Sequence, residues 1–200
     1  MIFDFLIFDI LRFIKQKNEL NPEYKVDFFT RLIASGLFIG YVPVASGTFG
    51  SLLGLAVFFI PGFTDFTIMT LCIIVFFLVG VITAEIMQPR YGYDPPEVVI
   101  DEIVGLWFTF MTSTIVLEFI KFKTFDPYLN FTTKLIFGLT CFFLFRFFDI
   151  IKLQPAKYFE EQKNGWGIMM DDIIAGLYAG ILSAVVSHFI WFRIFIRIVS

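Results

Sequence analysis

The chain has 200 residues, of which 58% are hydrophobic and 20% aromatic, and its formal net charge is −3. Its mean hydropathy of +0.83 is far above that of soluble globular proteins. The sequence has no basic tract with interleaved aromatic residues, which excludes nucleic acid as a partner. We therefore predict an all-α, polytopic helical membrane protein whose first partner is the bilayer.

The first 30 residues differ from the rest of the chain. Asp4 and Asp9 stand where a secretory signal peptide has basic residues, and no small-residue cleavage site follows. Met1–Lys17 is interpreted as an amphipathic helix that lies on the membrane surface. We predict an N-terminal interfacial segment over residues 1–30 and one membrane-embedded domain over residues 31–200, because no linker or internal repeat divides the chain.

About five membrane spans follow. Pro43 and two glycines interrupt the apolar run after residue 32, which predicts a re-entrant or interfacial segment to about residue 42 and a short span at about 49–60. Phe66–Ala84 has no Asp, Glu, Lys or Arg and is long enough for a hydrocarbon core of roughly 30 Å. The remaining spans are predicted at about 65–87, 98–119, 131–151 and 172–192.

The distribution of Lys and Arg favours a cytoplasmic N-terminus, although the bias is modest. With five spans, four distant polar segments then lie at the same cytoplasmic membrane boundary. These segments are residues 47–51, 101–102, 149 and 171–172.

Two acidic pairs are the candidate metal ligands. Asp101 and Glu102 stand near the start of one span, and Asp171 and Asp172 are predicted to open the last helix. Acidic residues also complement a helix dipole or cap a helix start, so these alternatives stay open. Adjacent carboxylates at a membrane boundary are costly without a cation, and Mg²⁺ prefers oxygen ligands. We predict a Mg²⁺ site from these four residues.

Two further segments are candidates for binding phosphate. "ASGTFGSLLG" places Thr48 and Ser51 among glycines at a helix mouth, where hydroxyls and free N–H groups suit an anion, although its glycines equally suit helix packing. In "FRFFDIIK", Arg146, Asp149 and Lys152 recur every three residues and share a helix face. An Arg146–Asp149 ion pair is the simpler interpretation; the functional one gives the cations to a phosphate and makes Asp149 a ligand or nucleophile.

Other chemistries are disfavoured. Cys141 precedes Arg146 by four intervening residues, whereas a cysteine phosphatase loop needs five. His188 lies deep in the last span and is the only histidine, which argues against a phosphohistidine mechanism, a Ser-His-Asp triad and a histidine-built zinc site. Both cysteines lie in apolar runs, so a disulfide framework is not expected.

The motifs "GTFGS", "DEIVG", "FRFFDIIK" and "GWGIMMDDIIAG" closely resemble, in the same order, those of the phosphatidylglycerophosphatase A family. The resemblance runs from about Gly36 to Gly180. It departs at Leu153, where the family usually has Pro after Lys, and at Asn164–Gly165, where a Gly-Gly pair is common. Both departures concern loop shape and substrate fit more than the charged groups. The matching positions are Gly47, Thr48, Gly50, Ser51, Asp101, Glu102, Arg146, Asp149, Lys152, Pro155, Gly165, Gly167, Asp171 and Asp172.

The resemblance implies a bacterial inner-membrane enzyme that hydrolyses phosphatidylglycerophosphate to phosphatidylglycerol and phosphate, with Mg²⁺, at the cytoplasmic face. Residues 31–200 would be its catalytic domain, with Asp149, Asp172 and Lys152 as catalytic candidates. Metal-activated water and attack by Asp149 both remain possible mechanisms. The rival functions are a cation transporter or channel subunit that uses the carboxylates, and an inactive structural homologue.

Overall fold

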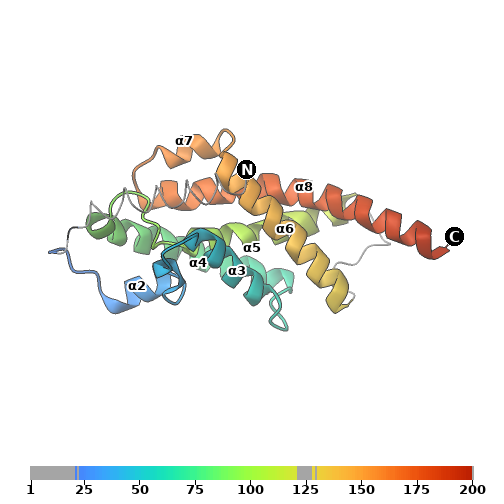
Figure 1. The fold of residues 1–200 in the computed structure, drawn as a ribbon, viewed down its shortest axis with the longest axis horizontal. Helices are drawn as coiled ribbons and strands as arrows, with labels where there is room; N and C mark the ends of the chain where they lie inside the picture. Colours follow the sequence, from blue (N-terminus) through green and yellow to red (C-terminus); the bar gives the residue numbers. More distant parts are fainter. Residues whose placement is uncertain (1–20, 22, 121–127, 129, 200) are drawn as a thin grey trace.

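A computed structural model describes residues 21, 23–120, 128 and 130–199. The described part of the chain is all-α, as the composition predicts (Figure 1). The predicted surface helix Met1–Lys17 lies outside the described residues. The elements are α2 (Phe28–Ala34), the short 3-10 helix η1 (Ile39–Tyr41), α3 (Ser46–Phe58), α4 (Phe66–Tyr91), α5 (Ile100–Phe119), α6 (Phe131–Ile151), α7 (Ala156–Glu160) and α8 (Gly165–Val199).

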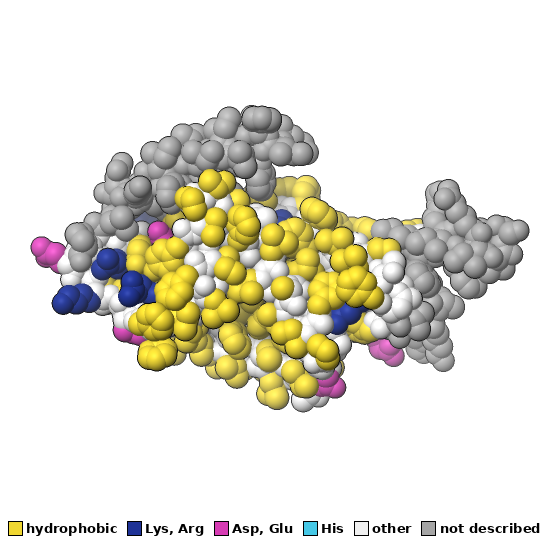
Figure 2. Space-filling view, turned by 60° about the horizontal axis from the view of Figure 1, so that its bottom comes forward, with side chains coloured by type: hydrophobic (Ala, Val, Ile, Leu, Met, Phe, Trp, Pro, Cys, Tyr) yellow, Lys and Arg dark blue, Asp and Glu magenta, His cyan; other side chains and the backbone are white. Residues whose placement is uncertain are grey.

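Three of these helices, α4, α5 and α8, are long and apolar enough to cross a membrane. α6 has 21 residues, with bounds that match the predicted span, whereas α3 has 13 residues and is too short to cross a bilayer of ordinary thickness unaided. Figure 2 shows a broad apolar surface, with charged side chains gathered mainly toward its two ends. This surface and the three long helices indicate a membrane protein.

Helix α5 forms the centre of the bundle. Its side chains are largely buried, including Leu106 and Phe110, which are fully inaccessible to solvent. α8 packs against α5 along a stripe of small residues, since a Cβ atom on Gly176 would stand 2.6 Å from the Gly105 carbonyl oxygen. The sequence predicted helix packing for the Gly176–Gly180–Ala184 stripe, and the contact with α5 confirms it.

The start of α5 is held by the hairpin of α2 and η1. The Val99 amide donates to the Ala34 carbonyl at 2.9 Å, and Gly40 approaches the Glu97 backbone so closely that a Cβ would stand 2.1 Å from its carbonyl oxygen. The segment before residue 42, predicted to be re-entrant or interfacial, therefore fixes the position of Asp101 and Glu102 at the start of α5.

The last helix begins at Gly165, earlier than the predicted start near residue 172. The Asn164 side chain accepts a hydrogen bond from the Gly167 amide at 2.7 Å, and Glu85 of α4 accepts from the Gly165 amide. A Cβ on Gly165 would stand 2.1 Å from the Val81 carbonyl oxygen, so only glycine allows this approach of α8 to α4. Asp171 and Asp172 therefore lie beyond the first turn of α8, and their predicted role of opening or capping this helix is wrong.

Away from the polar residues, aromatic rings fill the core of the bundle. Phe58 of α3 stacks on Phe110 of α5 with ring centroids 4.0 Å apart, and Phe137 of α6 packs against both. Cys141 is fully buried and Cys72 partly so, and both are free thiols, as predicted.

Candidate active site

Four helices meet at one end of the bundle. α3 and α5 begin there, α6 ends there, and α8 passes through with its second and third turns. The four polar segments identified in the sequence therefore meet in one place, as expected from their predicted position at the same membrane boundary.

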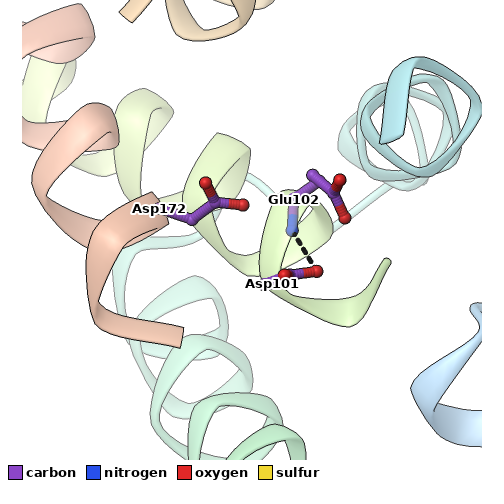
Figure 3. Close-up of side chains that lie close together, drawn as sticks. All are labelled: Asp101, Glu102 and Asp172. Atoms are coloured by element: carbon purple, nitrogen blue, oxygen red, sulfur yellow. Dashed lines mark hydrogen bonds between the residues drawn. The ribbon is translucent and has the colours of Figure 1, made fainter. Parts of the chain in front are cut away.

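Three carboxylates form the centre of the site. Asp101 and Glu102 come from the first turn of α5 and Asp172 from α8 (Figure 3). One carboxylate oxygen of each lies within 4.8 Å of the other two. Asp101 and Asp172 are 7% and 4% exposed, and Oε2 of Glu102 is buried without a hydrogen-bond partner among the described residues. Carboxylates this close and this buried repel one another unless a cation or protons lie between them.

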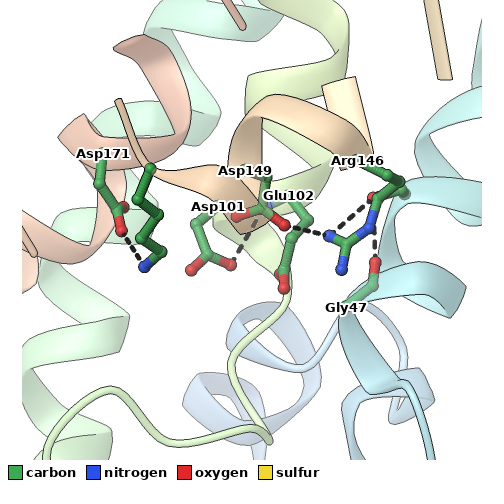
Figure 4. A network of polar contacts seen from close by, with 8 residues as sticks. Gly47, Asp101, Glu102, Arg146, Asp149 and Asp171 are labelled. Carbon is green, nitrogen blue, oxygen red and sulfur yellow. Dashed lines mark hydrogen bonds and ion pairs between the residues drawn. The ribbon is translucent and has the colours of Figure 1, made fainter. Parts of the chain in front are cut away.

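Asp171 faces a different partner from Asp172. Its Oδ2 atom accepts a hydrogen bond from Nζ of Lys152 at 2.7 Å, and both side chains are mostly buried. Of the four predicted metal ligands, three gather into one group, and Asp171 joins an ion pair beside it (Figure 4).

Arg146 lies between α6 and α3, on the side of the three carboxylates that is opposite Lys152. Its Nη1 atom is 2.7 Å from Oδ2 of Asp149, which forms the ion pair expected from their spacing (Figure 4). The same atom is 3.5 Å from Oγ of Ser51. The carboxylate of Asp149 also lies close enough to that of Asp172 for the two groups to interact. Asp149 therefore connects the arginine to the carboxylate group.

Gly47 is placed where a larger residue would displace charged side chains of the site. A Cβ atom there would stand 2.2 Å from Oε1 of Glu102 and 3.2 Å from both terminal nitrogens of Arg146. α3 begins at Ser46 after Ala45, whose φ of 52° is left-handed, and no side chain caps its N-terminus among the described residues. The uncapped first turn of α3, which contains the partly exposed Thr48, thus lies directly beside the arginine.

Ser51 is oriented differently from what the sequence suggested. It is fully buried, donates to the Gly47 carbonyl oxygen at 2.9 Å and contacts Arg146. This geometry suits a residue that positions the arginine and the helix start.

Lys152 and Glu97 lie outside the spans, and both have shifted pKa values. Burial alone would lower the pKa of the Lys152 ammonium, but the charges of Asp171 and Asp149 outweigh this effect and raise the pKa above its ordinary value. Lys152 is therefore a cation at neutral pH. Burial also raises the pKa of the Glu97 carboxyl group, which precedes α5.

Sequence reasoning missed the residues that hold the site in place. Glu85 caps α8 across a separation of 80 residues, which no local pattern reveals. Asn164 caps the same helix, and Asn before a Gly-rich helix start is a recognisable N-cap signal. Lys152 directly follows the last residue of α6 and has a left-handed φ of 47°. The chain therefore turns at the residue that contacts Asp171.

The described part of the chain is all-α, has three long apolar helices and gathers buried carboxylates and cations at one end. These features define a membrane protein with a polar site built for a charged ligand. The sequence model of phosphatidylglycerophosphatase A matches residues 32–187. The chain belongs to the phosphatidylglycerophosphatase A family, which confirms the resemblance of its motifs.

Curated relatives cover nearly the same region. A Haemophilus influenzae protein named phosphatidylglycerophosphatase A is 36% identical over 82% of this chain and 93% of its own length. An Escherichia coli protein of the same name is 28% identical over 87% of this chain and 93% of its own length. A Bacteroides thetaiotaomicron protein, provisionally named a phosphatidylinositol-3-phosphatase, is 34% identical over 79% of this chain and 93% of its own length. No solved structure gives a significant match.

Proposed function

We propose that this protein is a Mg²⁺-dependent lipid phosphate monoesterase that hydrolyses phosphatidylglycerophosphate to phosphatidylglycerol and phosphate at the cytoplasmic face of a bacterial inner membrane. Residues 31–200 would form the catalytic domain. The observation that carries the proposal is the position of Asp101, Glu102 and Asp172, within 4.8 Å of one another, between two side chains able to bind phosphate. Family membership supports the choice of substrate.

The donor set fits a hard divalent cation. It consists of oxygen atoms only, and the buried, unpartnered Oε2 atom of Glu102 is an orphaned acceptor of the kind a metal satisfies. We assign Asp101, Glu102 and Asp172 as the protein ligands and place Asp171 at the edge of the site, as the partner of Lys152. When bound, the ion would offset phosphate charge and increase the acidity of a coordinated water.

The cations on either side would hold the phosphate. Arg146 can offer two parallel N–H groups to phosphate oxygens, and Lys152 supplies a point charge on the opposite side. The uncapped start of α3, with Thr48, supplies further donors beside the arginine. Ser51 would act indirectly, because it is buried and contacts Arg146.

Asp149 is the residue best placed to act as nucleophile or base. It lies beside Asp172 and is paired with Arg146, so a phosphate bound to the arginine would be close to its carboxylate. Attack by Asp149 would form an aspartyl-phosphate with loss of the lipid alkoxide, and water would then release phosphate. In the alternative, water attacks phosphorus directly and Asp149 positions it; we favour this route because no separate acid–base residue for a second step is evident.

A second substrate has its own support. The Bacteroides relative, whose provisional name gives phosphatidylinositol 3-phosphate as substrate, is about as similar to this chain as the relatives named for phosphatidylglycerophosphate. Both lipids carry a phosphate monoester, so the same charged groups would serve either. Cation transport has less support, because the rings of Phe58 and Phe110 stack within the bundle core that a path through it would have to cross.

The deciding experiment measures phosphate release in detergent micelles from both lipids, with Mg²⁺ and with excess EDTA, beside an Asp172→Asn variant. We expect release chiefly from phosphatidylglycerophosphate, and only with both the metal and Asp172. Preferential release from phosphatidylinositol 3-phosphate would select the second substrate. No release from any lipid phosphate by folded protein would favour a transport or structural role.

A further inference from the structure

The contact between α3 and α6 changes along the two helices. Away from the site it is apolar, since Phe58 packs on Phe137 and a Cβ on Gly138 would stand 3.0 Å from Cδ1 of Leu55. At the level of the site the helices meet through polar groups, namely Arg146 with Ser51 and with the start of α3 at Gly47. The arginine therefore lies in the seam between α3 and α6.

The other seams around the site are closed by tight packing. Between α3 and α5, the Trp107 indole donates to the Gly54 carbonyl oxygen at 3.0 Å. Between α6 and α8, the rings of Phe148 and Tyr178 lie 5.8 Å apart, and the Tyr178 hydroxyl donates to the Gln154 carbonyl at 2.7 Å. Backbone-to-backbone contact at Gly176 closes the seam between α5 and α8.

Apolar side chains exposed on the outside of the bundle flank the arginine. Leu139, Phe143, Arg146 and Ile150 follow one another at intervals of four, three and four residues, which places them on one stripe of α6. The three apolar members are 37%, 65% and 41% exposed, whereas the arginine side chain is turned inward and is 14% exposed. On α3, Leu52 follows the buried Ser51 and is 41% exposed.

We propose that the acyl chains of the lipid substrate lie in the seam between α3 and α6, against Leu52 on one side and Phe143 and Ile150 on the other. This inference rests on the proposed function and adds the place where the lipid enters. A phosphate monoester lipid keeps its chains in hydrocarbon while its headgroup reaches the site, because moving the chains into water would be costly. The α3–α6 seam has a phosphate-binding side chain that faces inward and apolar side chains that face outward at the same level.

The first test compares a long-chain phosphatidylglycerophosphate with a short-chain, water-soluble analogue as substrates. Leu52→Trp and Ile150→Trp would obstruct the seam, and Leu71→Trp on α4 is the matched control, since Leu71 is 57% exposed on another face. We expect both seam variants to lower the ratio of kcat/KM for the long-chain lipid to that for the short-chain analogue at least fivefold, with the control unchanged. An equal ratio in all four proteins would overturn the proposal.

The second test uses unaltered protein and does not depend on hydrolysis. A phosphatidylglycerophosphate with a photoactivatable group in its acyl chain is crosslinked in micelles, with and without excess unlabelled lipid. Labelling of residues 46–58 and 131–151 that the excess lipid suppresses would support the seam. Suppressible labelling confined to other helices, or none at all, would overturn it. Absence of phosphate release with suppressible labelling of α3 and α6 would refute the proposed reaction and leave the lipid site standing.

Discussion

The Nζ atom of Lys152 lies 2.7 Å from Oδ2 of Asp171, and this ion pair joins the end of α6 to the second turn of α8. The next residue, Asp172, joins Asp101 and Glu102 instead. Consecutive residues on a helix point about 100° apart, so two neighbouring aspartates serve two different groups. We therefore expect substitutions of Asp171 and of Asp172 to have different effects on activity.

Asp172→Asn should lower kcat by on the order of 10²-fold or more, because it removes a carboxylate from the group that would hold the metal. Asp171→Asn should lower kcat/KM roughly tenfold through a misplaced Lys152 and leave the Mg²⁺ concentration for half-maximal activity unchanged. Steady-state kinetics over a Mg²⁺ titration measure both effects. A large increase in that Mg²⁺ concentration for Asp171→Asn would show that Asp171 is itself a ligand.

Removal of the metal should also be visible without any assay of activity. Binding of Mg²⁺ to the three buried carboxylates stabilises the folded state, by about 2.7 kcal/mol at a free concentration a hundred times the Kd. Thermal unfolding in detergent should therefore give a higher Tm with Mg²⁺ than with EDTA. Asp172→Asn is the control and should lose most of this difference; an unchanged difference in that variant would place the ion elsewhere.

Gly47→Ala should lower kcat/KM by about 10²-fold, because the added methyl group would displace Glu102 and Arg146, and a displacement of about 1 Å in a site costs this much. Gly138→Ala is the matched control. It adds the same methyl group to the same bundle, where it meets the flexible end of Leu55 at 3.0 Å and the Phe58 ring at an ordinary contact distance of 3.5 Å. Size-exclusion profiles of both variants separate a local effect from misfolding. Comparable activity in the two would show that the Glu102 and Arg146 positions tolerate movement.

Local signals predicted one helix well and another poorly. The bounds of α6 could be predicted because its ends are set within the chain, by the capping box of Asn130 and Thr133 and by the charged residues near its end. The start of α8 was not predicted, because "GWG" has the composition of a loop and the Asn164 cap before it is a weaker local signal. Glycine there serves the close approach to Val81 and the cap from Glu85, and both partners are far away in the sequence.

The same distinction applies to the site. Periodicity and membrane level predicted that the charged segments meet, and they do. The partner of each side chain depends on how the helices rotate against one another, which the spacing of Asp171 and Asp172 does not reveal. Ser51 illustrates the same limit, since its position in a glycine-rich helix start predicted a ligand contact and its hydroxyl faces Arg146 and Gly47 instead.

Substitution of Gly176 tests whether the α5–α8 contact holds Asp172 in place. A Cβ there would stand 2.6 Å from a backbone oxygen of α5, so Gly176→Ala should lower the free energy of unfolding by about 1–3 kcal/mol, the usual cost of overpacking. The two helices would move apart, and because Asp172 lies one turn away on α8, its distance from Asp101 should grow. Activity should then fall together with stability.

Leu177→Ala, at a neighbouring residue that is 37% exposed, should change the free energy of unfolding by less than about 0.5 kcal/mol. Thermal unfolding and the Mg²⁺ titration on the same samples decide the point: a destabilised Gly176→Ala variant with the Mg²⁺ dependence and kcat of the unaltered protein would separate helix packing from the geometry of the carboxylates.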